Sequence, residues 1–148
     1  MDEQPAVAQL RELINKASLS LSKISAGRAA EPLKDGGWSR KQVLGHIIDS
    51  ASNNHQRFVR ASIQPELVWP NYEQESWVKA NGYDAAPWDE LVQFWTLYNL
   101  HLLRVISRIP EEKTSTTCRI GNESPMTLAE LIASYIKHLE HHLNQILA

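Results

Sequence analysis

Four long segments of the sequence carry apolar residues at the spacing of an α-helix, and this periodicity constrains the fold more than any other feature. The segments run from about 5 to 27, 39 to 62, 87 to 109 and 127 to 148. No segment shows the alternation typical of a half-buried strand. We therefore predict an all-α protein, a four-helix bundle, and at 148 residues a single domain spanning 1–148.

Capping signals mark the beginning of two of these helices. Ser39 is followed three residues later by Gln42, and Thr127 is followed by Glu130 at the same spacing. In such a capping box each side chain satisfies a free backbone amide of the other residue. Pro87 suits the first turn of the third helix, because a proline there loses no helical hydrogen bond.

The connection between the second and third helices, residues 63–86, is unusually long. It is long enough to cross the whole bundle and start the third helix parallel to the second, where a short loop would force an antiparallel neighbour. Residues 71–80 can form a short helix within it. Trp69 and Trp77 wall a pocket over the histidine site, cover a dimer contact or pin the connection, and we favour pinning.

Composition excludes several classes of protein. The formal net charge is −2 and the sequence contains no run of lysine or arginine, which argues against nucleic acid as a partner. Cys118, in a predicted loop, is the only cysteine, so the chain has no internal disulfide. No apolar run approaches the roughly 20 residues that span a membrane, and the polar N-terminus is unlike a signal peptide. We expect a cytoplasmic protein.

Histidines form the most informative pattern. His138 and His142 lie one helical turn apart at the inward face of the last helix, and His46 borders the apolar face of the second. If these two helices run antiparallel, the three imidazoles meet at one end of the bundle and can hold one divalent metal ion. The alternative is a purely structural role, since such pairs also arise by chance. His55 and His101 fit ordinary hydrogen bonds at the core edge, and His101 is the first reserve ligand.

A polar stripe continues from His46 along the second helix through Ser50, Asn53 and Arg57. An unpaired polar group in a core costs roughly 1–3 kcal/mol, so these side chains need partners. Facing histidines with a bound ion would provide some of them.

Metal-binding imidazoles usually donate their second N–H to a carboxylate or carbonyl group. Asp49, Asn53 and Tyr135 are nearest to the histidines by helix position. For Asp49 we favour a different role, in which it points to solvent or pairs with Arg57 or Lys41.

Two segments resemble a known family. In residues 38–50 a tryptophan and a capping serine precede a Gly-His pair and a downstream acidic residue. In residues 135–146 two histidines four apart precede a Gln-Ile ending. Both segments resemble the DinB superfamily, and the resemblance covers the whole chain in length and helix order.

The resemblance implies an up-down-down-up bundle that binds a divalent metal, often zinc or nickel, through one histidine of the second helix and two of the last. The matching positions are His46, His138 and His142. It also implies a possible homodimer. Some members are regarded as metal-dependent hydrolases, and relatives are transferases or isomerases that use low-molecular-weight thiols.

Three neutral imidazoles would leave a bound ion with an open position, as in catalytic zinc sites. We therefore expect a metal-dependent hydrolase or a thiol-dependent transferase, with a small molecule or a thiol as its partner. The alternative is a non-catalytic bundle that binds a metal or small ligand. The lack of an evident carboxylate general base favours that alternative.

Overall fold

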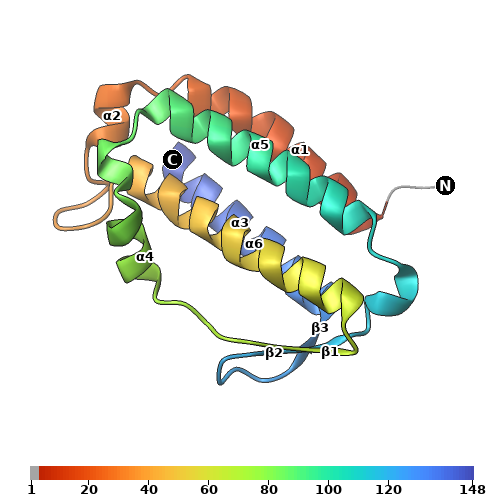
Figure 1. Ribbon diagram of the computed structural model, residues 1–148. Coiled ribbons are helices and arrows are strands. Elements are labelled where there is room, and N and C mark those ends of the chain that lie inside the picture. The colour runs from red at the N-terminus through yellow and green to blue at the C-terminus, as the bar shows by residue number, and fades with distance from the viewer. Residues whose placement is uncertain (1–3) are drawn as a thin grey trace.

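Four long helices form the body of the computed structural model, which describes residues 4–148. They are α1 (Pro5–Ser22), α3 (Arg40–Ile63), α5 (Trp88–Ser107) and α6 (Leu128–Leu147). Both α1 and α3 pack against α5 and α6, so α1 and α3 occupy opposite corners of the bundle (Figure 1). The predicted four-helix bundle is present.

The direction of each helix follows from the connections. In Figure 1, α3 and α5 run in the same direction, and α1 and α6 run in the opposite one. This is the up-down-down-up order that the family resemblance implies, and it agrees with the parallel start of the third helix that the long crossover connection allows. Its consequence is that α3 and α6, which carry the candidate histidines, are antiparallel neighbours.

Both predicted capping boxes are present at the starts of α3 and α6. The Ser39 hydroxyl accepts a hydrogen bond from the Gln42 amide (3.1 Å), and the Gln42 side chain accepts one from the Ser39 amide (2.9 Å). Thr127 and Glu130 make the same pair of bonds, each at 3.1 Å. These caps fix where each helix begins and hence the level of its histidines.

The first helix is shorter than predicted. It ends at Ser22, and a separate short helix, α2 (Ala26–Ala30), follows. The Ser25 hydroxyl accepts a hydrogen bond from the Arg28 amide (3.1 Å) and so caps α2. A serine that bonds locally to the backbone competes with continuation of a helix, which explains the break.

The all-α prediction was wrong in one respect, because the bundle also carries a small three-stranded sheet. Its strands are β1 (Glu66–Trp69), β2 (Thr117–Ile120) and β3 (Met126–Thr127). β1 pairs with β2 in parallel, and β2 pairs with β3 antiparallel. Cys118, predicted in a loop, is buried in β2. Strands this short give almost no periodic signal, which is why the sequence did not reveal them.

The crossover connection continues from β1 along the outside of α3 to α4 (Gln74–Asn81), the predicted short helix, and a 3₁₀ turn then leads into α5 (Figure 1). The Arg60 guanidinium lies 4.1 Å from the centre of the Trp69 ring, and the rings of Tyr72 and Trp77 lie 5.4 Å apart. These contacts fit the pinning role favoured for the two tryptophans.

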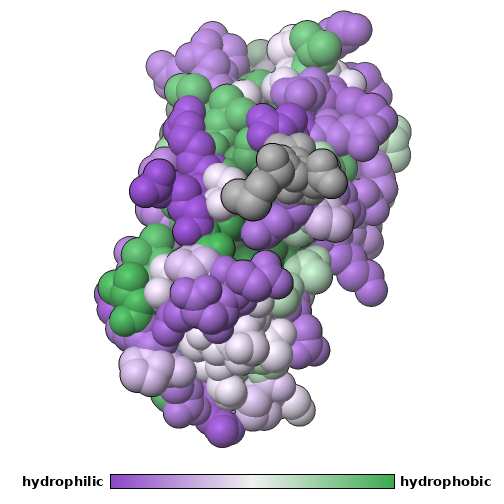
Figure 2. Space-filling model, turned by 90° about the vertical axis from the view of Figure 1, so that its right-hand side faces the viewer, coloured by the Kyte–Doolittle hydropathy of each residue, from purple (hydrophilic) through white to green (hydrophobic). Residues whose placement is uncertain are grey.

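The surface is largely hydrophilic on the side shown in Figure 2, with small hydrophobic patches between. Within residues 4–148, no helix has the length and apolar character needed to cross a membrane. The large exposed hydrophobic side chains include Leu19, Ile63, Val68 and Leu97, which belong to four different elements. The homodimer stays a prediction.

Candidate metal centre

The three predicted histidines converge between α3 and α6. His46 Nε2 lies 3.2 Å from His138 Nε2, which in turn lies 3.1 Å from His142 Nε2. One ligand atom from each residue lies within 4.8 Å of the other two. The antiparallel arrangement of the two helices brings together side chains that are 92 residues apart in the chain.

The spacing of these nitrogens suits a metal ion. Two nitrogens bound at about 2.0–2.1 Å to one tetrahedral zinc ion lie about 3.3 Å apart. A neutral imidazole has one N–H donor, so His138 Nε2 cannot donate to both neighbours. An ion that accepts all three lone pairs would resolve this conflict, so the residues fit a divalent cation.

The environment keeps the three imidazoles neutral. Burial, with a smaller contribution from the neighbouring histidines, lowers the pKa of His46 from 6.5 to about 4 and that of His138 to about 4. Burial also lowers the pKa of His142. Neutral imidazoles carry the lone pair that a metal needs, so protons compete weakly for this site near neutral pH.

Comparison with known proteins identifies the family. The model of the DinB superfamily matches residues 5–146. This chain belongs to the DinB superfamily. Among its DinB relatives, a Bacillus mycoides protein named "Putative metal-dependent hydrolase" is 25% identical over 95% of this chain and 80% of its own length. A Geobacillus thermodenitrificans protein of the same name is 22% identical, over 99% of this chain and 83% of its own.

Two solved structures share the DinB fold of this chain. YfiT from Bacillus subtilis, described as "a probable metal-dependent hydrolase with an unusual four-helix bundle topology", has a TM-score of 0.83 at 19% identity, covering 95% of this chain and 81% of YfiT. A mycothiol-dependent maleylpyruvate isomerase has a TM-score of 0.79 at 16% identity, covering 97% of this chain and 60% of the isomerase. At these identities the likeness shows the fold alone.

One side chain of this DinB site was missed in the sequence. Gln145 Oε1 lies 2.9 Å from His142 Nδ1 and can accept a hydrogen bond from its N–H, which leaves the lone pair of Nε2 of that ring free to bind a metal. The signal was the three-residue spacing along α6, which places both side chains on one face. His46 Nδ1 is buried with no hydrogen-bond partner, and the Trp38 ring centre lies 5.3 Å from that of His46.

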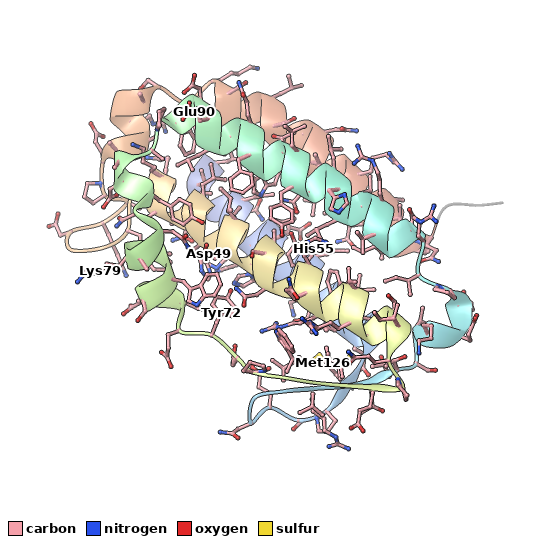
Figure 3. The ribbon with its side chains drawn as sticks, in the orientation of Figure 1. Asp49, His55, Tyr72, Lys79, Glu90 and Met126 are labelled. Carbon is pink, nitrogen blue, oxygen red and sulfur yellow. The ribbon has the colours of Figure 1, made fainter. Side chains whose placement is uncertain are left out.

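Asp49 lies inside this DinB protein, so our preference for solvent or a pair with Arg57 or Lys41 was wrong. It is 2% exposed and accepts hydrogen bonds from Tyr83 Oη (2.6 Å) and Asn81 Nδ2 (2.9 Å). The cause is the crossover connection, in which α4 and the following turn cover this face of α3 (Figure 3). Burial raises the pKa of Asp49 from 3.8 to about 6, although the Tyr83 hydrogen bond opposes this shift.

The other two candidates for outer hydrogen bonds also face elsewhere. Asn53 donates to the backbone oxygen of Asp49 (2.9 Å). The Tyr135 hydroxyl donates a hydrogen bond to the side-chain oxygen of the buried Asn99. Neither makes a hydrogen bond to a histidine of the cluster, so Gln145 is the side chain that orients one of these rings.

The remaining histidines lie outside the cluster. His55 Nδ1 makes a 3.0 Å hydrogen bond with Tyr98 Oη, as expected for a residue at the core edge. The exposed His101 ring lies 5.2 Å from His55 and is not in the group that could hold an ion. His141 is exposed on α6.

A cavity of about 200 Å³ adjoins the histidines. His138 forms part of its wall, and the polar stripe of α3 forms another part. Tyr72 from the crossover connection and Met126 from β3 also line it, and both are labelled in Figure 3. The residues of the polar stripe that line the cavity are Ser50 and Arg57, as predicted, together with Asn54 in place of the predicted Asn53.

Proposed function

We propose that this DinB protein is a metal-dependent hydrolase of a small molecule, in which His46, His138 and His142 hold one divalent ion, zinc or nickel. The observation that carries the proposal is the convergence of three neutral imidazole nitrogens, at 3.1 and 3.2 Å, beside a cavity. Three protein ligands leave an open position, which is typical of catalytic rather than structural zinc.

When bound, such an ion lowers the pKa of a water ligand towards 7 and polarises a substrate carbonyl group. The protein supplies positioning. Gln145 holds the His142 ring by its Nδ1 atom, and the two capping boxes hold α3 and α6 at matching levels. The cavity beside His138 would admit the substrate, and its volume of about 200 Å³ favours a small one. The names of the relatives, metal-dependent hydrolases, support this choice.

Thiol-dependent transfer is the second candidate. Its support is the shared fold with a mycothiol-dependent isomerase, together with the affinity of soft sulfur for zinc. Cys118 is buried in β2, and burial raises the pKa of its thiol, so a reactive thiol would have to come from solution. A non-catalytic metal-binding bundle is the third reading, because no carboxylate within residues 4–148 makes a hydrogen bond to the three clustered histidines.

Metal content and hydrolysis test the proposal together. The protein is loaded with zinc or nickel, and bound metal is measured beside the hydrolysis of small esters and amides and the conjugation of a soluble thiol. We expect about one ion per chain, lost in His142→Ala and kept in His141→Ala, which removes the adjacent exposed histidine.

Hydrolysis should fall at least about 100-fold in His46→Ala. Ester and amide hydrolysis that His46→Ala leaves unchanged would refute the hydrolase. Thiol conjugation without hydrolysis would favour the transferase, and stoichiometric metal with neither reaction would favour the non-catalytic bundle.

A further inference from the structure

A buried cation at the cavity wall has two nitrogens without a hydrogen-bond partner among the described residues. Arg57 is 7% exposed and lines the cavity about three turns beyond His46 along α3. Its Nε and Nη2 atoms are buried without any hydrogen-bond acceptor. Within residues 4–148, no carboxylate lies within ion-pair distance of Arg57.

Such an arrangement is costly, because a buried charge normally needs a paired and hydrogen-bonded partner. Burial lowers the pKa of the Arg57 guanidinium, while Tyr72 and Glu123 act in the opposite direction. The guanidinium carbon lies 5.9 Å from the centre of the Tyr72 ring, at the outer limit of about 6 Å for a cation–π contact. Glu123, on the loop between β2 and β3, is exposed and makes no ion pair with it. The protein itself thus leaves the charge largely uncompensated.

The cavity connects this cation with the histidine cluster. Arg57 and His138 line the same space, and the wall between them includes Ser50 and Asn54 from α3 and Ser134 from α6. Among the described residues, Arg57 is the one lysine or arginine in the lining, and Glu123 is also there. One cation with a carboxylate nearby suits a singly charged anion better than a phosphate dianion.

We propose that the substrate is a small organic acid whose carboxylate binds Arg57 while its hydrolysable end reaches the three histidines. This inference rests on the proposed function. A guanidinium binds a carboxylate through two parallel N–H···O bonds, and Nε and Nη2 are the two nitrogens that form one edge of this planar group. The carboxylate would supply the partner that Arg57 lacks and would fix the substrate along the cavity.

Bifunctional ligands test this assignment on the zinc-loaded protein. The monohydroxamates of succinic, glutaric and adipic acid each carry a zinc-binding group and a terminal carboxylate at increasing distances. Their controls carry a neutral carboxamide in place of the carboxylate. Calorimetry should show at least one acid binding about tenfold or more tightly than its carboxamide, because a charge-assisted pair adds that much affinity.

Variants of α3 identify the side chain responsible. The preference for the acid should disappear in Arg57→Met and weaken in Arg57→Lys, which keeps the charge but lacks the planar fork. Arg60→Met is the matched control, one turn away, because Arg60 already bonds the Gln56 side chain (3.0 Å). Without ligand, Arg57→Met should unfold at the same or a higher temperature than the wild type, since it removes an unpaired buried charge.

Equal binding of acids and carboxamides would overturn the inference and leave the metal centre intact, whatever the unfolding temperature of Arg57→Met. A protein that retains no zinc would instead contradict the proposed function. Arg57 is then tested in the metal-free protein by titration with glutarate, following its side-chain Nε resonance. A saturable shift of that resonance, lost in Arg57→Lys, supports the inference, and its absence overturns it.

Discussion

Gly45 offers a sharp test of how the histidine site is built, because it lies against a ring that covers α3. A Cβ atom at this position would overlap Cγ and Cδ2 of Tyr83 and lie 2.7 Å from Cε2. Tyr83 is largely buried and donates a hydrogen bond to Asp49. Gly45→Ala, a substitution at the residue before His46, therefore forces the Tyr83 ring away from α3.

The expected cost follows from three contributions. Overpacking a well-filled site costs about 1–3 kcal/mol. Loss of the Tyr83 hydrogen bond to a carboxylate costs about 1.5–3 kcal/mol. Alanine regains up to about 1 kcal/mol over glycine inside a helix. We expect Gly45→Ala to lower the free energy of unfolding by about 2–4 kcal/mol, allowing for partial relaxation of the ring.

Urea unfolding of the metal-free protein near pH 7.5 measures this change. Gly27→Ala is the matched control, because nothing lies within 4 Å of its new Cβ atom in α2, and it should stabilise by about 0.5–1 kcal/mol. In a Tyr83→Ala background the ring is gone, so Gly45→Ala should become neutral or stabilising. The resulting coupling between the two sites should be at least about 2 kcal/mol.

A Gly45→Ala protein as stable as Gly27→Ala would refute this reasoning. So would an equal cost of Gly45→Ala with and without the Tyr83 ring. Either result would mean that the approach of this ring does not require glycine before His46.

Three further predictions follow from the electrostatics of the site. Because the pKa of Asp49 is about 6 in the native protein, above its ordinary 3.8, its protonated form stabilises the fold at low pH and this contribution is lost as pH rises from about 4 through 6. Between pH 4 and pH 8, the free energy of unfolding of Asp49→Asn should therefore rise by up to about 3 kcal/mol relative to that of the wild type, as measured by urea unfolding of the metal-free proteins. A difference between the two proteins that does not change with pH would contradict this prediction. Because burial lowers the pKa values of His46 and His138 to about 4, protons should not displace zinc from them at about pH 5.5. Elemental analysis after dialysis at about pH 5.5 should find the zinc still bound, and loss of most zinc there but not at about pH 7.5 would contradict this expectation. Gln145→Leu removes the oxygen that accepts a hydrogen bond from His142 Nδ1, so it should weaken zinc binding about 10–100-fold in chelator competition. Gln145→Glu keeps an acceptor oxygen at this position and should bind zinc as the wild type does. Equal zinc affinities of Gln145→Leu and the wild type would exclude this orienting role.

The parts of the molecule that the sequence predicted depend on local rules. Each long helix carries its apolar period within about two dozen residues, and each capping box joins side chains three residues apart. His138 and His142 are four residues apart, so helical geometry alone places them on the same face of α6. His46 could be added because caps at the starts of α3 and α6 fix the levels of the histidines once the two helices are antiparallel.

The parts that the sequence did not reveal depend on distant segments. β1 and β2 are four residues each, and the whole of α5 lies between them in the sequence. Neither strand is long enough to show a periodic pattern by itself. The burial of Asp49 is decided by Tyr83 and Asn81, and their position depends on the path of the crossover connection. Arg57 was recognised as part of a polar stripe, but only the packed bundle shows that its Nε and Nη2 atoms have no hydrogen-bond acceptor among the described residues.

The order of the helices also affects when the proposed metal site forms during folding. His46 and His138 are separated by 92 residues, and α5 lies between their helices in the chain. Closing so large a loop is slow compared with forming individual helices, so the coordination geometry should be among the last features to appear during refolding. Zinc uptake would then report completion of the native topology and lag behind the recovery of helical circular dichroism.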